Sequence, residues 1–113
     1  MARKYDIVAR LRAKNEKPFV MIDENHTYTI NTSKTNVMAI MALYDEYEKK
    51  DSNKENMELI DKVIKTALGE AALNYINESN MTFEAVELII EAIMAGISGS
   101  EIEDIEKKTQ EKK

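Results

Sequence analysis

The chain has no cysteine, one histidine, one proline and three glycines among its 113 residues. Without cysteine it forms no disulfide, no thiolate metal site and no cysteine nucleophile, and this composition fits a reducing compartment. Three glycines do not supply a glycine-rich loop that could cradle a phosphate. The single histidine, His26, falls in a predicted polar turn, whereas a general base or metal ligand needs partners in matching geometry. We therefore expect no catalytic residues, no metal, no cofactor and no enzymatic activity.

Long hydrophobic runs are also missing. The basic stretch at residues 1–15 is not followed by an apolar segment, so we expect neither a signal peptide nor a membrane span. A length of 113 residues corresponds to one domain with one modest core.

Charge is unevenly distributed along the chain, whose net charge is −5. Residues 1–18 hold six basic and two acidic residues, a net charge of +4, whereas residues 19–97 carry −8. An acidic body argues against broad nucleic-acid binding, because that function needs a basic surface to neutralise phosphates. The basic start is a solvated arm, a segment that meets an acidic neighbour, or a contact for nucleic acid.

The first predicted elements are a short helix and a β-hairpin. Residues 5–14 carry a thin apolar stripe, and Pro18 ends any helix there. Phe19–Ile22 is an apolar run of strand length, and Thr27–Ile30 alternates, with Tyr28 and Ile30 on one face. The four polar residues between these runs, 23–26, indicate the turn of a hairpin. Because two strands alone are barely stable, the hairpin must pack on helices or pair its edges.

Helical periodicity dominates the next fifty residues. One helix begins at Ser33 or Thr35 and ends near Lys49; a second ends or kinks at Gly69, and Glu70–Asn77 continues as a short third. The apolar stripes are Val37, Ile40, Met41, Tyr44 and Tyr47 in the first helix, and Met57, Ile60, Val63, Ile64, Ala67 and Leu68 in the second.

The most apolar segment is Phe83–Ile97. Thr82 is a good N-cap for it, and Met81 can pack on Val86 as a hydrophobic staple. About two thirds of its circumference avoids charge, more than the stripe of roughly 100° on an ordinary surface helix. We expect it to be the central helix of the domain, with part of its surface completed by another chain.

These segments predict a mostly helical α+β fold with a short N-terminal helix, one β-hairpin and three to four packed helices. We expect a basic arm over residues 1–18, a hairpin-plus-helix domain over 19–99 and a flexible charged tail over 100–113. Two isoleucines in that tail cannot offset the entropy of ordering fourteen residues.

Two surfaces are candidates for partner binding. The hairpin has two edges for one layer of helices to cover, and an uncovered edge invites a neighbour. The apolar helix also has a face of small residues that exceeds what one helical layer needs. The predicted partner-binding residues are Phe19, Met21, Tyr28, Ile30, Ala85, Leu88, Ala92 and Gly96. We also expect a homo-oligomer, because the basic start and acidic body of two copies could meet head to tail.

The order of these motifs resembles the tail assembly chaperones of long-tailed bacteriophages (siphophages) and prophages of Gram-positive bacteria. The residues that carry the likeness are "KPFVMID" and "YTINTS" of the hairpin, Leu68-Gly69-Glu70-Ala71-Ala72, and the apolar helix Phe83–Ile97. The likeness covers most of Lys17–Glu106. It implies a protein of the bacterial host cytoplasm that binds the tape-measure protein and helps the tail tube protein assemble around it, without catalysis.

Other interpretations of the same sequence stay open. A small phage or bacterial regulator could contact nucleic acid through the basic arm. A structural ring component of a phage tail is a third interpretation, and an enzyme is the last.

Overall fold

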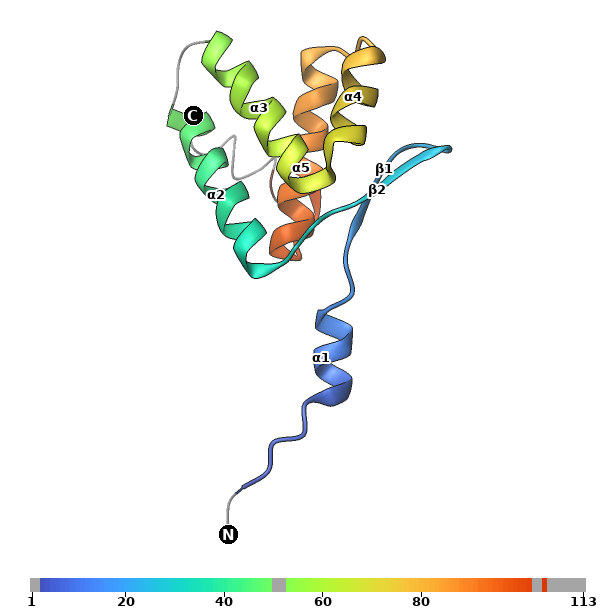
Figure 1. Cartoon of the computed structure of the whole chain (residues 1–113), viewed down its shortest axis with the longest axis vertical. Coiled ribbons are helices and arrows are strands. Elements are labelled where there is room, and N and C mark those ends of the chain that lie inside the picture. The colour runs from blue at the N-terminus through green and yellow to red at the C-terminus, as the bar shows by residue number, and fades with distance from the viewer. Residues whose placement is uncertain (1–2, 50–52, 103–104, 106–113) are drawn as a thin grey trace.

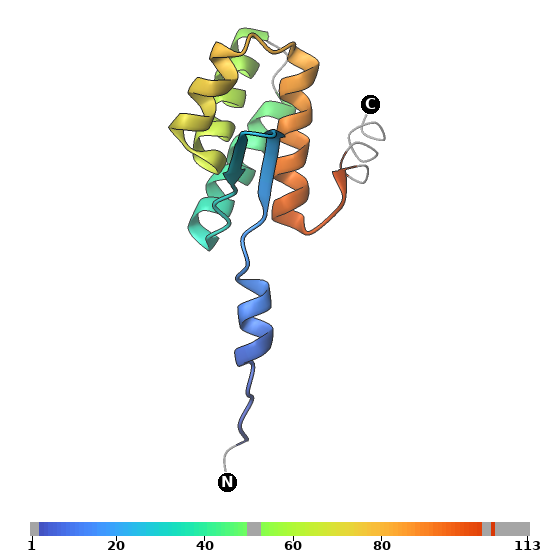
Figure 2. The ribbon, with the colours of Figure 1, turned by 90° about the vertical axis from the view of Figure 1, so that its right-hand side faces the viewer.

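The structure is a computed structural model that describes residues 3–49, 53–102 and 105. A small body of helices with a hairpin beside it carries an arm that stands away from it (Figures 1 and 2). This confirms the prediction of a mostly helical α+β fold. The elements are α1 (Val8–Lys14), β1 (Phe19–Asp23), β2 (His26–Thr29), α2 (Lys34–Lys49), α3 (Asn53–Leu68), α4 (Glu70–Glu78) and α5 (Phe83–Ser98).

The two strands pair antiparallel, with Val20 opposite Tyr28 and Met21 opposite Thr27. A register shift between Met21 and Asp23 brings Asp23 opposite His26. The loop therefore has two residues instead of the predicted four. The side chain of Asp23 stabilises this tighter turn, because its carboxylate accepts the N–H of Asn25 at 2.8 Å.

One face of the hairpin is buried, as its alternation predicted. Val20 is 8% exposed and Ile30 is 1% exposed, and Tyr28 is half-buried. Beyond the strands, the N–H of Ile30 donates to the carbonyl of Pro18 at 2.8 Å, and the N–H of Asn31 donates to that of Ala67 at 2.9 Å. The second bond ties the hairpin to the end of α3, where helix carbonyls lack partners of their own.

Helix α3 packs against both α2 and α4, and this shifts its buried face. Leu59 is 5% exposed although it lies off the predicted stripe, whereas Met57, predicted on the stripe, is 56% exposed. On α2, Met41 is 50% exposed. It lies about 100° around the helix from the buried Ile40. The predicted stripes were thus correct in their centres and wrong at these edges.

Gly69 separates α3 from α4, as predicted. Its φ of +97° is in the region that favours glycine. The chain reverses there, so that α4 runs back along α3 (Figure 1).

Helix α5 contributes buried residues to the core, as predicted, but the central helix is α3, which packs against α2, α4 and α5. Thr82 is the N-cap of α5 and its side-chain oxygen accepts the N–H of Ala85 at 3.2 Å. Ile90 and Ile93 are 3% and 0% exposed and belong to the main core. The outer side of α5 is less covered, because Leu88 is 49% exposed. Within the described part of the chain, no helix is both long and apolar enough to cross a membrane.

Of the predicted tail, 100–113, the structure describes residues 100–102 and 105. Ile102 is half-buried and Ile105 is 9% exposed, so both isoleucines lie against the body. The rest of the predicted tail lies outside the described residues, and its flexibility stays a prediction.

Candidate functional site

An apolar groove of about 380 Å³ lies between β1 and α5. Figure 2 looks onto this side of the molecule, where the strand and the helix lie next to each other. We call it the β1–α5 groove; its lining residues are Val20, Met21, Ile22, Met81, Ala85, Leu88, Ile89, Ala92 and Ile102. None of these side chains is charged, so the groove suits an apolar partner surface and offers no acid–base group.

The spacing of residues on α5 builds one wall of this groove. Ala85, Leu88 and Ala92 are three and seven residues apart, so they share one helical face. The two alanines leave space, and Leu88 stands between them. On the strand side, Met21 is 64% exposed and has a flexible thioether side chain that can adapt to a partner.

The structure brings four of the eight predicted partner-binding residues to this groove, namely Met21, Ala85, Leu88 and Ala92. Phe19 is outside the lining but is 63% exposed on the same strand. Tyr28 is half-buried on the inner face of the hairpin.

Ile30 and Gly96 were also predicted to bind a partner, but the structure places them against each other inside the body. Ile30 is 1% exposed. A Cβ atom at position 96 would lie 2.5 Å from Cδ1 of Ile30 and 3.3 Å from Cγ of Pro18. The glycine in the small-residue face thus allows α5 to approach the hairpin, and it does not face a partner.

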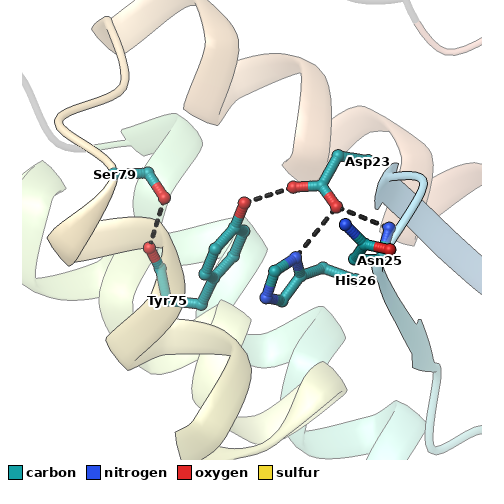
Figure 3. A network of polar contacts seen from close by, with 5 residues as sticks. All are labelled: Asp23, Asn25, His26, Tyr75 and Ser79. Atoms are coloured by element: carbon teal, nitrogen blue, oxygen red, sulfur yellow. Dashed lines mark hydrogen bonds and ion pairs between the residues drawn. The ribbon is translucent and has the colours of Figure 1, made fainter.

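Sequence reasoning missed a polar network that joins the hairpin turn to α4 (Figure 3). The Asp23 carboxylate accepts the hydroxyl of Tyr75 on one oxygen and Nδ1–H of His26, at 2.8 Å, on the other. The rings of His26 and Tyr75 stack with centroids 3.6 Å apart and an interplanar angle of 12°. The hydroxyl of Ser79 donates to the carbonyl of Tyr75 at 2.7 Å. Tyr75 is 52 residues from Asp23, and no sequence pattern links the two.

Hydrogen bonding from Tyr75, and then from His26, lowers the pKa of Asp23 from 3.8 to about 2. The same Asp23 hydrogen bond raises the pKa of the Tyr75 hydroxyl. An aspartate that orients a histidine is part of many hydrolytic sites, but those also need a nucleophile next to the histidine. The hydroxyl of Ser79 instead bonds to the helix backbone, and the hydroxyl of Tyr75 bonds to Asp23 (Figure 3). We therefore interpret the network as a clamp between the hairpin turn and α4.

Metal binding has no geometric support in the described residues, where no three His, Asp or Glu side chains gather as a metal site requires. The β1–α5 groove, which has the exposed Met21 and Leu88 in its lining, is the candidate functional site.

Comparisons of the chain with protein-family models, with curated proteins and with solved structures found no match.

Proposed function

We propose that the protein is a non-catalytic assembly chaperone that holds an apolar helical segment of a partner in the β1–α5 groove. The resemblance to tail assembly chaperones suggests a tape-measure protein as this partner, with the tail tube protein assembling around it in the cytoplasm of the bacterial host. The observation that carries the proposal is an open, uncharged groove with the exposed Leu88 and Met21 in its lining.

A helix fits this groove better than an added strand. β1 pairs with β2 on one side and lies beside α5 on the other (Figure 2). The groove thus presents side chains rather than a long free strand edge. An amphipathic helix docks into such a surface through anchors at positions i, i+3, i+4 and i+7. Apolar helices of a long partner would aggregate if left uncovered, and covering them is the work of a chaperone.

The test is co-expression of a tape-measure protein with groove variants. Leu88→Asp and Met21→Asp place a charge in the groove at exposed positions, so both variants should fold. Met38→Asp is the matched control, because Met38 is also 64% exposed but lies on α2. The wild-type protein and the control should raise the soluble fraction of the tape-measure protein, and the two groove variants should not. An equal effect of Leu88→Asp and wild type would overturn the proposal.

One observation supports nucleic-acid contact as a second function: residues 3–17 are all exposed, and most of their charged side chains are basic. Binding through this arm would weaken steeply with added salt. A fluorescence titration of duplex DNA and of single-stranded RNA at two salt concentrations tests this alternative. Tight, salt-sensitive binding together with no solubility gain in the co-expression experiment would favour the regulator.

A further inference from the structure

The arm, residues 3–17, has apolar side chains that the described part of the chain leaves at least half exposed. Tyr5 is 75% exposed, and Ile7, Val8 and Leu11 are 50–57% exposed. The N–H of Leu11 donates to the carbonyl of Ile7 at 2.7 Å, so these two side chains stand one helical turn apart. A helix as short as α1 is not stable alone in water. Its stripe therefore needs a surface to dock on.

A second apolar groove, of about 280 Å³, lies where α3, α4 and the start of α5 meet. We call it the three-helix groove; it is lined by Met57, Ile60, Asp61, Ile64, Ile76, Asn77, Met81, Phe83 and Val86. Met57 is 56% exposed and Phe83 is 45% exposed, so apolar surface is open at its rim. It shares only Met81 with the β1–α5 groove.

Charge distinguishes the two grooves as sites for the arm. Asp61 lines the three-helix groove, and the exposed Glu58 precedes it by three residues on α3. No acidic side chain lines the β1–α5 groove. Asp61 is exposed, but its neighbours remove part of its hydration and raise its pKa, so a cation beside this carboxylate would compensate for the lost water. On α1, Arg10 and Arg12 flank the apolar stripe on its two sides.

The base of the arm and the three-helix groove lie at opposite ends of α5. Pro18, where the arm joins the body, is next to Gly96, whereas the groove includes Phe83 and Val86. At a rise of ~1.5 Å per residue these ends are about 20 Å apart. In Figures 1 and 2 the arm extends away from the body.

We propose that the arm of one copy docks in the three-helix groove of a second copy, so that copies associate head to tail. The apolar stripe of α1 would cover Met57 and Phe83, and the arginines would approach Asp61. Because the arm and the groove are different surfaces, each contact leaves one arm and one groove unused, so the contact repeats from copy to copy and gives a closed ring, of which a reciprocal pair is the smallest, or an open chain. This inference does not depend on the proposed function, which uses the other groove.

The first experiment is sedimentation velocity of the full chain across a concentration series. Leu11→Asp disables the arm, and Asp61→Arg disables the groove by reversing its charge. The matched controls are Ala13→Asp, on the opposite side of α1 from Leu11, and Glu46→Arg, at an exposed position on α2. The wild type and both controls should increase in mass with concentration, and the two disabled variants should stay monomeric with unchanged far-UV circular dichroism.

The decisive sample is an equimolar mixture of Leu11→Asp and Asp61→Arg. The first variant retains a working groove and the second a working arm, so the mixture should form a complex of two chains and nothing larger. A monomeric wild type at every concentration, or a mixture without complex, would overturn the proposal. Leu88→Asp, in the β1–α5 groove, should leave the association unchanged. Loss of association in that variant would mean that the arm docks in the β1–α5 groove, and this would overturn the proposal.

Discussion

Asp23 is the residue through which the hairpin turn is fastened to the helices. Its carboxylate accepts hydrogen bonds from Tyr75, His26 and the backbone of Asn25. These bonds favour the ionised form, so the folded state binds a proton more weakly at Asp23 than the unfolded state does. The stabilisation is therefore complete above the ordinary pKa of 3.8 and is lost as pH falls toward about 2.

Tyr75→Phe tests this network, because it removes the hydroxyl donor and keeps the ring that stacks on His26. The pKa of Asp23 should then return toward its ordinary value. In urea melts at a series of pH values, wild-type stability should fall more steeply than that of Tyr75→Phe between pH 3.8 and about 2. Tyr28→Phe is the control and should follow the wild-type curve. Parallel curves for wild type and Tyr75→Phe would show that the hydroxyl does not hold the carboxylate.

Gly96 and Ile30 form the second residue-scale contact that can be tested. An alanine at 96 should raise helix propensity by about 1 kcal/mol, but its Cβ would overlap Cδ1 of the buried Ile30. Overpacking of this kind costs typically 1–3 kcal/mol, so after subtracting the propensity gain Gly96→Ala should destabilise the protein by up to about 2 kcal/mol.

Ile30→Val removes the overlapping methyl group and should by itself cost about 0.5–1.5 kcal/mol. In that background Gly96→Ala should no longer destabilise. The free energies of unfolding of the two single variants and the double variant, from urea melts, give the coupling energy. If the two single changes in unfolding free energy simply add up in the double variant, residues 96 and 30 are not coupled, and the hairpin must move away to accept the new methyl group.

At the scale of elements, α5 has one side in the core and one side in the β1–α5 groove. Ile90 is 3% exposed and Leu88 is 49% exposed. Ile90→Asp should destabilise the body by more than about 4 kcal/mol, because it buries an unpaired carboxylate. Leu88→Asp should change stability by less than about 1 kcal/mol. Chemical denaturation checks both, and near-native stability of Ile90→Asp would show that this side of α5 is not part of the core.

Local sequence signals predicted most elements because their causes are local. Thr82 caps α5 through a bond to a residue three positions away, and Gly69 ends α3 through its own backbone angle. The burial of Leu59 was not predictable, because it depends on α3 having a neighbour on two sides.

The candidate site likewise combines features that have local causes with features that depend on tertiary contacts. Ala85, Leu88 and Ala92 were identified from helical spacing, which is a local property. The inward position of Ile30 against Gly96 depends on how the hairpin meets α5, and the clamp at Asp23 depends on a partner 52 residues away. Neither arrangement has a signature in the order of residues.

At the scale of the whole molecule, the arm makes the protein elongated. The radius of gyration is 16.1 Å and the long axis is 60 Å, whereas a compact domain of this length has a radius of gyration of about 13 Å. The arm contributes no residue to the buried core. The body should therefore keep its fold when the arm is removed.

Limited trypsin digestion checks this expectation. Arg10, Arg12 and Lys14 are all exposed, so the arm should be cut before any site within α3. Mass spectrometry should identify the products, and the remaining body should retain its far-UV circular dichroism. If copies associate through the arm, cleavage at these sites should become slower as protein concentration rises. Early cleavage within α3 would contradict the separation of arm and body.

The close approach of Gly96 to Ile30 and Pro18 also has an evolutionary consequence. The hairpin and the last helix can meet at this distance only while the three positions remain compatible. In homologues, a larger residue at 96 should appear together with a shorter side chain at 30, so the two alignment columns should covary. Positions 18, 30 and 96 would then form a sparse signature that identifies distant relatives after overall sequence identity has decayed.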